Sequence, residues 1–361
     1  MTVQKPTRFL ITGSTGFVGR QLVARLIAQY GSAAVTAMAN VHLTSREENF
    51  LRAFKKQKVR VIQCDLLDLP KLDIPIPSFD VIYHLAAYVE TEKASPAIAV
   101  NVGGTKNLLD WLGQSLCGKR LVYTGTLASM DRRGLPIGPM NESTLCFPKT
   151  SYGRTKLEAE QIIQAQSFRL AFDYTILRLC TILGRDFRSG GMFDLFPQLL
   201  RKNALATRLN WPGRTSLLCL SDLIEIMIAV PQLSQTRDEL YLVSNGEDPT
   251  FDQLRDQIAR TLNLKRDRIA LPRWFWKSIG FGALLGSRSS KFIPHSLRTF
   301  CWRISLMVYD GIYADASKLN AALKPSYRSL ESGLREAYPQ SFTPNRSERP
   351  APAVAGNGPI P

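Results

Sequence analysis

A glycine-rich segment near the start of the chain constrains the fold more than any other part of the sequence. The apolar run 9–11 leads through Thr12 to Gly13, Gly16 and Gly19. Apolar residues then recur at helical spacing, at Val18, Leu22, Val23, Leu26 and Ile27. This pattern predicts a strand, a tight turn and an amphipathic helix.

Each glycine of such a unit has a separate task. One forms the turn, another lets backbone approach a pyrophosphate, and the third allows the helix and strand to pack closely. The helix N-terminus presents free N–H groups and a positive dipole end to the phosphates. The segment therefore predicts a dinucleotide-binding site, and a glycine turn of purely structural origin is the alternative.

Strands and helices alternate through the first half of the chain. Short apolar runs predict six strands, at 8–12, 35–39, 59–63, 81–85, 121–124 and 174–179. Helical patterns lie between them, notably at 45–56, 97–112 and 151–167. This alternation predicts an α/β protein with a doubly wound parallel sheet of the Rossmann type.

The pattern loosens after Ile182. A helix opening at 221–222 and a strand at 239–243 are expected to return to the sheet, and a helix is expected at 250–263. The predicted division is a nucleotide-binding core at 1–185 with 215–245 returning to it, a smaller C-terminal substrate-binding lobe at 186–214 and 246–340, and a tail at 341–361. The tail is rich in Pro, Gly, Ser and Asn, so we expect it to be disordered.

The composition excludes several classes of protein. The six cysteines lie far apart with no Cys-x-x-Cys pair, which indicates scattered thiols instead of a disulfide framework or a zinc site. The three histidines show no metal-ligand spacing, so no metal site is expected. No secretory signal precedes the first strand, and no run approaches the roughly 18 apolar residues of a spanning helix. We expect a cytoplasmic protein, with peripheral attachment to a membrane as an open alternative.

A second informative feature is the segment that begins Ser151-Tyr152 and continues to Lys156. On a helix, Tyr152 and Lys156 are four residues apart and share one face. A nearby ammonium stabilises phenolate over phenol and so lowers the pKa of the tyrosine. Tyr152 can then act as acid or base toward a carbinol or carbonyl oxygen. A surface aromatic–lysine pair without function is the alternative.

With these motifs in view, the chain resembles the extended short-chain dehydrogenase/reductase family, NAD-dependent epimerase/dehydratase type, over about residues 8 to 340. Further segments match the family in order, at Asp65-Leu66, His84–Ala87, Asn101, Tyr123–Thr126, Leu177-Arg178 with Gly184, and Asp315–Lys318. The resemblance implies a catalytic set of Thr126, Tyr152 and Lys156. It also implies cofactor contacts at Gly13, Gly16, Phe17, Val18, Gly19, Asp65, Leu66, Leu85, Ala86, Ala87, Asn101, Tyr152 and Lys156.

Structural roles remain open for several of these residues. Asn101 is also a good helix cap, and Asp65 a good cap for the following turn. Thr126 could simply close a strand. His84 is expected to pack beneath the cofactor instead of serving as a base or a ligand.

Two departures from the family pattern bear on specificity. The end of the second strand has Ala39 and Asn40 where many members have an acidic residue for the adenosine ribose. Without that carboxylate a 2′-phosphate is not repelled, which slightly favours NADP(H) over NAD(H). Thr181 stands where sugar-nucleotide epimerases tend to have Asn, which argues against a nucleotide-sugar substrate.

Half of the formal net charge of +16 lies in one stretch. Residues 265–303 contain nine Lys or Arg and one acid, Asp267. The same stretch contains many apolar residues, among them Trp274, Phe275, Trp276, Phe281, Leu284, Leu285, Phe292, Phe300 and Trp302. This composition suits an anionic membrane surface. It equally suits the core of a substrate lobe with a basic rim, and nucleic acid is a less favoured third reading.

The sequence therefore predicts an NAD(P)-dependent oxidoreductase or epimerase/dehydratase. It would move hydride between the nicotinamide and a secondary alcohol or ketone carbon of a small substrate, which could be apolar. Net reduction, oxidation, epimerisation and dehydration all remain open, as does a homodimer. The rival hypothesis is a non-catalytic, cofactor-binding scaffold on a membrane or RNA.

Overall fold

The chain folds around a single large parallel sheet in its computed structural model. The structure describes residues 7–89, 94–130, 138–187, 191–288, 294–309 and 313–339. Seven strands pair side by side in the order β3-β2-β1-β4-β5-β6-β9, and every pairing between neighbours is parallel. The strands are β1 (Phe9–Thr12), β2 (Val35–Ala39), β3 (Arg60–Gln63), β4 (Val81–His84), β5 (Arg120–Thr126), β6 (Asp173–Leu179) and β9 (Glu239–Val243). The predicted doubly wound Rossmann-type sheet is thus confirmed, while the tail at 341–361 lies outside the described residues.

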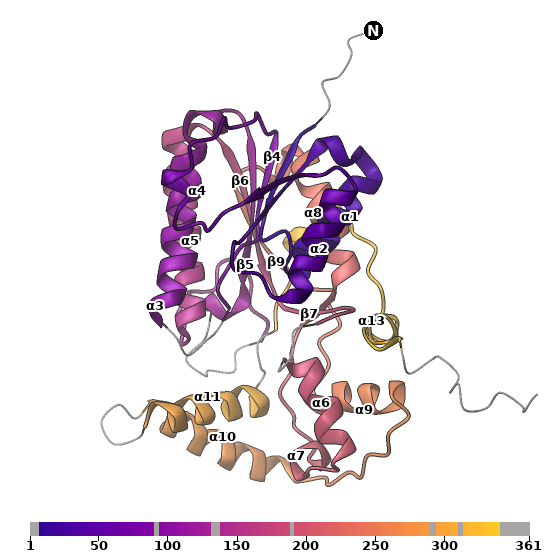
Figure 1. Cartoon of the computed structure of the whole chain (residues 1–361). Coiled ribbons are helices and arrows are strands. Elements are labelled where there is room, and N and C mark those ends of the chain that lie inside the picture. Colours follow the sequence, from indigo (N-terminus) through magenta and orange to yellow (C-terminus); the bar gives the residue numbers. More distant parts are fainter. Residues whose placement is uncertain are drawn as a thin grey trace, which may run out of the picture.

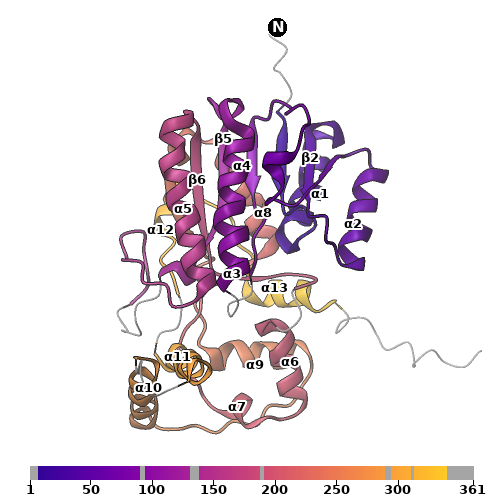
Figure 2. The same ribbon diagram turned by 60° about the vertical axis from the view of Figure 1, so that its left-hand side comes forward.

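Helices cover both faces of the sheet (Figures 1 and 2). One face is covered by α1 (Phe17–Tyr30), α2 (Ser45–Lys56), α8 (Leu220–Ala229) and α12 (Ser317–Leu323). The other face is covered by α4 (Gly104–Leu112) and α5 (Ser151–Leu170). In β1, Phe9 and Ile11 pack into the first layer while Leu10 packs into the second. Because both faces are buried, the strands have continuous apolar runs, and this made them visible in the sequence.

One predicted helix is built differently from the expectation. The stretch predicted as a single helix at 97–112 consists of α3 (Ala94–Ala97), a π-helical turn (Ile98–Gly103) and then α4. A π-helical turn widens the helix locally and occurs often at functional sites. Here it contains Asn101, one of the predicted cofactor contacts.

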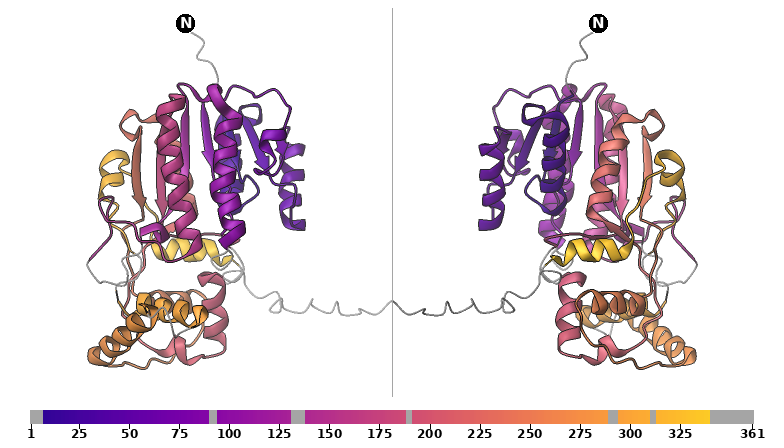
Figure 3. Two further views of the ribbon diagram at one scale, coloured as in Figure 1. Left: turned by 90° about the vertical axis from the view of Figure 1, so that its left-hand side faces the viewer. Right: turned by 90° about the vertical axis from the view of Figure 1, so that its right-hand side faces the viewer.

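A second group of elements lies beyond the carboxyl ends of the strands. A small two-stranded parallel sheet, β7 (Thr181–Leu183) with β8 (Leu217–Cys219), leads into it. The helices of this part are α6 (Met192–Arg201), α7 (Leu205–Arg208), α9 (Phe251–Thr261), α10 (Arg273–Arg288), α11 (His295–Val308) and α13 (Leu330–Ala337). Figure 3 shows the orange helices α10 and α11 as a pair below the sheet.

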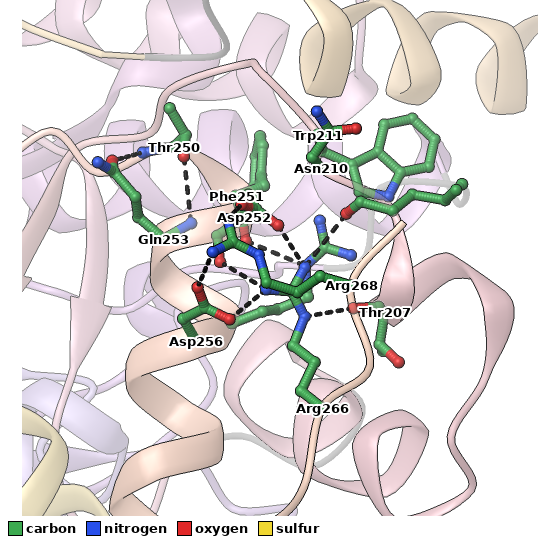
Figure 4. A network of polar contacts seen from close by, with 12 residues as sticks. Thr207, Asn210, Trp211, Thr250, Phe251, Asp252, Gln253, Asp256, Arg266 and Arg268 are labelled. Carbon is green, nitrogen blue, oxygen red and sulfur yellow. Dashed lines mark hydrogen bonds and ion pairs between the residues drawn. The ribbon is translucent and has the colours of Figure 1, made fainter. Parts of the chain in front are cut away.

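A network of charged side chains fixes the segment that leads into α10 (Figure 4). The guanidinium of Arg266 is buried and forms ion pairs with Asp252 and Asp256 of α9. Arg268 pairs with the same two carboxylates. Two of the nine cations counted at 265–303 are therefore paired with carboxylates of α9, Arg266 in the interior and Arg268 at the surface, which the sequence pattern did not reveal.

The aromatic residues of the basic stretch are divided between core and surface. Trp276 is buried, packs against Trp211 in a tilted arrangement with ring centroids 4.7 Å apart, and donates its indole N–H to Asn210 at 3.2 Å. Trp274, two residues earlier, is exposed. The helix α10 thus has one face in the core and one exposed face, and the predicted attachment of 265–303 to a membrane stays a prediction.

Candidate functional site

The turn after β1 requires glycine at two positions for different reasons. Gly13 has a φ of +65°, a left-handed conformation that favours glycine. A Cβ on Gly19 would lie 2.2 Å from the carbonyl oxygen of Gly13, so α1 can approach the turn only without a side chain there. Gly16 is the N-cap of α1 and lines a cavity. Its backbone is therefore placed where a phosphate would meet the start of the helix.

A cavity of about 200 Å³ opens above this turn. Its walls include seven of the predicted cofactor contacts, namely Gly13, Gly16, Asp65, Leu66, Leu85, Ala86 and Ala87. Phe17 and Val18 instead pack against the hydrophobic core beneath α1. The bare backbone of the glycine turn and the cavity fit the adenosine diphosphate half of a dinucleotide.

The part of the cavity near β2 contains a carboxylate that sequence reasoning missed. Glu47 lines it beside Ala39 and Asn40. Glu47 belongs to the capping box of α2 and accepts from the backbone N–H of Thr44 at 2.8 Å. Arg46, the first Lys or Arg after Asn40 in the sequence, pairs with Asp186 at 2.6 Å. The spacing of Thr44 and Glu47 in the sequence is typical of a capping box and could have indicated this role of Glu47. The position of Glu47 beside β2, however, depends on the path of the loop at 40–44.

His84 connects three elements of the cofactor site. Its Nε2 lies 2.9 Å from Thr105 Oγ1, which donates to the carbonyl of Asn101, so Nε2 carries the proton. Its Nδ1 then accepts from Thr12 Oγ1 at 2.8 Å. Burial lowers the pKa of His84 to about 3, which keeps the ring neutral. This arrangement agrees with the packing role expected for His84.

The other members of this network hold the loop that follows β4. Thr12 Oγ1 accepts from the backbone N–H groups of Leu85 and Ala86, each at 3.2 Å. The Asn101 amide accepts from the N–H of Tyr88 at 2.7 Å and donates to Thr155 Oγ1 of α5 at 2.9 Å. Asn101 therefore ties the loop to α5, while its predicted contact with the cofactor stays a prediction.

Asp65 caps the turn after β3, as one of the two readings of the sequence expected, and its predicted contact with the cofactor stays a prediction. Its carboxylate accepts from the N–H of Leu67 at 2.9 Å, as a turn cap does. It also lines the cavity, where the amide of Asn40 donates to it at 3.4 Å. The turn-capping bond therefore holds the carboxylate at the wall of the cavity.

The start of α5, which contains Tyr152, packs closely against the segment that follows Thr126 at the end of β5. A Cβ on Gly153 would lie 2.3 Å from the carbonyl oxygen of Ala128, so the first turn of α5 rests directly on the segment after Thr126. Thr150 caps α5 and accepts from the N–H of Gly153 at 3.0 Å. The hydroxyl of Thr126 accepts from the N–H of Ala128 at 3.2 Å.

Lys156 lies one turn below Tyr152 and is fully buried. Its ammonium sits over the ring of Tyr123, 4.0 Å from the centroid. Burial lowers the pKa of Lys156 to about 7, and the negative charge of Glu160 opposes that shift. The lysine can therefore gain or lose a proton near neutral pH.

Glu160 and Arg178 form a buried ion pair that sequence reasoning did not identify. Arg178 on β6 donates from Nη2 to Glu160 Oε2 at 2.7 Å. A Cβ on Gly125 would lie 2.4 Å from Glu160 Oε1, so the strand next to Thr126 must leave room for this carboxylate. Two features of the sequence could have indicated this pair. Gly125 precedes Thr126, and Glu160 follows Tyr152 and Lys156 at the same spacing of four residues.

A second, larger cavity of about 1160 Å³ adjoins Tyr152. It lies between the start of α5 and the helix α11 of the C-terminal part. Thr181, one of the departures from the family pattern, also lines it. Its other walls combine cations and apolar groups, with Lys149, Arg154, Arg298 and Arg303 among the former and Met192, Trp302 and Leu306 among the latter. Within the described ranges, no group of three or more His, Cys, Asp or Glu side chains could hold a metal ion.

Comparison with known proteins agrees with this geometry. The model of the NAD dependent epimerase/dehydratase family matches residues 9–241. The chain is 24% identical over 326 residues to UDP-glucose 4-epimerase of Vibrio cholerae, covering 85% of this chain and 93% of that protein. It is 25% identical over 320 residues to sterol demethylase protein B of Methylococcus capsulatus, covering 86% and 90%.

Among solved structures, one of the similar chains is UDP-glucuronic acid 4-epimerase from Bacillus cereus, in complex with UDP-glucuronic acid and NAD. The superposition has a TM-score of 0.70 at 19% sequence identity and covers 93% of this chain and 99% of that chain. At this identity the similarity establishes the fold alone.

Proposed function

The chain belongs to the NAD dependent epimerase/dehydratase family, and from this premise we propose that it transfers hydride at a secondary alcohol or ketone carbon with Tyr152 as acid and base. The protein is an enzyme of the oxidoreductase or epimerase/dehydratase kind, as its relatives are. The observation that supports the catalytic assignment is the contact of Gly153 with Ala128, which sets Tyr152 beside the Thr126 segment at the wall of a large cavity.

Each residue of the proposed set has a separate task. Thr126 donates a hydrogen bond to the reacting oxygen, and Tyr152 gives that oxygen a proton or takes one from it. Lys156, when protonated, lowers the pKa of Tyr152 and donates to the ribose of the cofactor. The nicotinamide, when bound, accepts or supplies the hydride. The glycine turn and the loop 85–87 would hold the rest of the dinucleotide.

The cofactor preference is proposed as NADP(H) over NAD(H), by a small margin. Ala39 and Asn40 themselves present no carboxylate at the end of β2 that would repel a 2′-phosphate. Glu47 lines the same cavity and opposes the preference. Arg46 is engaged with Asp186 and does not add a free cation.

The proposed substrate is a small molecule with a secondary alcohol or ketone on an apolar body. Met192, Trp302 and Leu306 offer such a body a wall beside Tyr152. The similarity to sterol demethylase protein B, whose name refers to a sterol, supports this class. The similarity to UDP-glucose 4-epimerase favours the sugar-nucleotide alternative, and the cations of the same cavity suit its phosphates. A non-catalytic scaffold has no support among the relatives, and a homodimer stays a prediction.

The test is the variant Tyr152→Phe, which removes only the hydroxyl. We expect turnover to fall by about 10²–10⁴-fold, the range for a positioned acid–base group, while cofactor binding and the melting temperature stay near wild type. Sterols, steroids and nucleotide sugars would serve as trial substrates, with nicotinamide absorbance as the readout. Tyr174→Phe, which removes a hydroxyl at the surface of β6, is the matched control. Unchanged turnover in Tyr152→Phe would refute the assignment.

A further inference from the structure

The helices α10 and α11 contain most of the uncompensated charge of the basic stretch. From residue 269 to residue 309 the sequence has no Asp or Glu, yet it has six Lys or Arg. Arg266 and Arg268, just before the hairpin, are paired with Asp252 and Asp256 and so do not contribute a free charge. The positive charge of this region therefore belongs to the α10–α11 hairpin.

The outer face of α10 is apolar as well as basic. Trp274, Phe281 and Leu285 are 68%, 62% and 55% exposed. Their spacing of seven and four residues places them on one stripe of the helix. Arg273 and Lys277 are exposed on the flank of that stripe. On α11, Leu297 and Phe300 are exposed too, so both helices present apolar side chains to the outside.

This apolar stripe is not a packing defect, because the opposite face of the hairpin is firmly anchored. Trp276 and Ala283 are buried on the inner side of α10. A Cβ on Gly280 would lie 2.6 Å from the ring of Tyr309, and a Cβ on Gly286 would lie 2.8 Å from Cys301 Sγ, so the two helices are in close contact. Figure 1 shows the pair extending away from α6 and α9.

We propose that the outer face of the α10–α11 hairpin docks on an anionic phospholipid bilayer. Trp and Phe side chains favour the headgroup level of a bilayer, where their rings are partly buried. Arg and Lys beside them are attracted to anionic lipids. A helix with one apolar face and cations at its flank lies in the plane of the interface. Among the described helices none is long and apolar enough to cross a membrane, so the docking is peripheral.

The hairpin also forms a wall of the cavity beside Tyr152. Arg298, Trp302 and Leu306 of α11 line that cavity, while Leu297 and Phe300 of the same helix are exposed. Docking would therefore bring the substrate cavity next to the lipid headgroups. This consequence rests on the proposed function, since it matters only for an apolar substrate that partitions into the bilayer. The docking itself does not depend on it.

The test is co-sedimentation of the full-length protein with vesicles. Vesicles of phosphatidylcholine with about 30% phosphatidylglycerol, which have a strongly anionic surface, are compared with vesicles of pure phosphatidylcholine at low and high salt. We expect pelleting with the anionic vesicles that weakens as salt screens the cations. The pair Arg273→Gln and Lys277→Gln should weaken partitioning by about thirtyfold, or about fivefold for each cation removed. The pair Trp274→Ala and Phe281→Ala should weaken it by at least about tenfold and remove the salt-resistant part.

Matched variants elsewhere on the surface separate docking from a general change of charge or apolarity. Lys55→Gln with Lys56→Gln removes two exposed cations from α2, and Leu145→Ala with Phe168→Ala removes two exposed apolar side chains. Both should pellet as wild type does. Tyr152→Phe should too, so a failure of the catalytic assignment leaves this result unaffected.

Several outcomes would overturn the proposal. It fails if neither vesicle pellets the protein, if neutral and anionic vesicles pellet it equally, or if the matched variants lose binding as much as the hairpin variants do. It also fails if the protein sediments as a dimer that Trp274→Ala with Phe281→Ala converts to monomer, because the stripe would then be a subunit interface.

Discussion

The variant Lys156→Met should stabilise the cofactor-free protein while abolishing its proposed activity. Lys156 is fully buried, and burial lowers its pKa to about 7 because the ammonium loses its hydration. Methionine has a similar length and carries no charge, and its thioether packs well against an aromatic ring such as that of Tyr123. The substitution therefore removes the unfavourable burial of a charge with little change in packing.

The size and the pH dependence of the effect follow from proton linkage. Lysine has its ordinary pKa of 10.5 in the unfolded chain, so between pH 7 and 10.5 the unfolded chain binds more protons than the folded one. A lysine of this kind destabilises the fold most below pH 7, and the penalty is relieved as the pH rises toward 10.5. At 1.36 kcal/mol per pKa unit, Lys156→Met should raise the free energy of unfolding by about 4 kcal/mol at pH 7 and by about 2 kcal/mol at pH 9.

The assay is urea unfolding of the cofactor-free protein, followed by tryptophan fluorescence at both pH values. The control is Lys106→Met, which replaces an exposed lysine of α4 and should change stability by less than about 0.5 kcal/mol at either pH. The prediction is refuted if Lys156→Met does not raise the free energy of unfolding at pH 7, or raises it more at pH 9 than at pH 7. Either result would show that the fold does not lower the pKa of Lys156.

Two further predictions concern the cofactor cavity. Gly16→Val should abolish dinucleotide binding in isothermal titration while leaving the fold intact. Gly19→Ala should instead lower the melting temperature, because its Cβ would lie 2.2 Å from the carbonyl oxygen of Gly13. Normal affinity in Gly16→Val would contradict the assignment of the turn as the pyrophosphate site. Ala39→Asp should shift the cofactor preference toward NAD(H). Glu47→Gln should shift it toward NADP(H), since glutamine keeps the capping box of α2 but not the negative charge. Equal affinity ratios in wild type and both variants would show that neither side chain is near the 2′ position of the adenosine ribose.

Much of the sheet could be predicted because its strands are buried on both faces. Continuous apolar runs mark β1, β2 and β4, and the glycine turn after β1 adds a local signal that needs no knowledge of the rest of the fold. The boundaries were less certain. The strand β5 continues to Thr126, two residues beyond the predicted end, because it pairs with β6 as far as Leu179.

The polar contacts that organise the site could not be predicted in the same way. His84 meets Thr12 from 72 residues away and Thr105 from 21 residues away, and those contacts exist only once β1, β4 and α4 are in register. The pair Glu160–Arg178 likewise depends on α5 lying over β6. Sequence spacing alone contains no information about such pairs.

The helical phase of α10, in contrast, can be read from the sequence. Trp274 and Trp276 are two positions apart and so point about 200° away from each other on a helix. A count of aromatic residues over 265–303 does not distinguish the two tryptophans, although Trp274 is 68% exposed and Trp276 only 4%. Helical phase would have assigned Trp276 and Ala283 to the core, and Trp274 and Phe281 to the surface.

The order of residues along α5 explains why Lys156 titrates near neutral pH. Tyr152, Lys156 and Glu160 follow one another on one helical face, from the cavity wall into the core. Had Glu160 been left without Arg178, its carboxylate would have paired with the buried ammonium and raised the pKa of Lys156. Because Arg178 donates hydrogen bonds from Nε and Nη2 to Glu160, part of that negative charge is already compensated, and burial is the larger influence on the pKa of the lysine. Burial thus keeps a proton of Lys156 exchangeable one turn from the tyrosine that is proposed to use it.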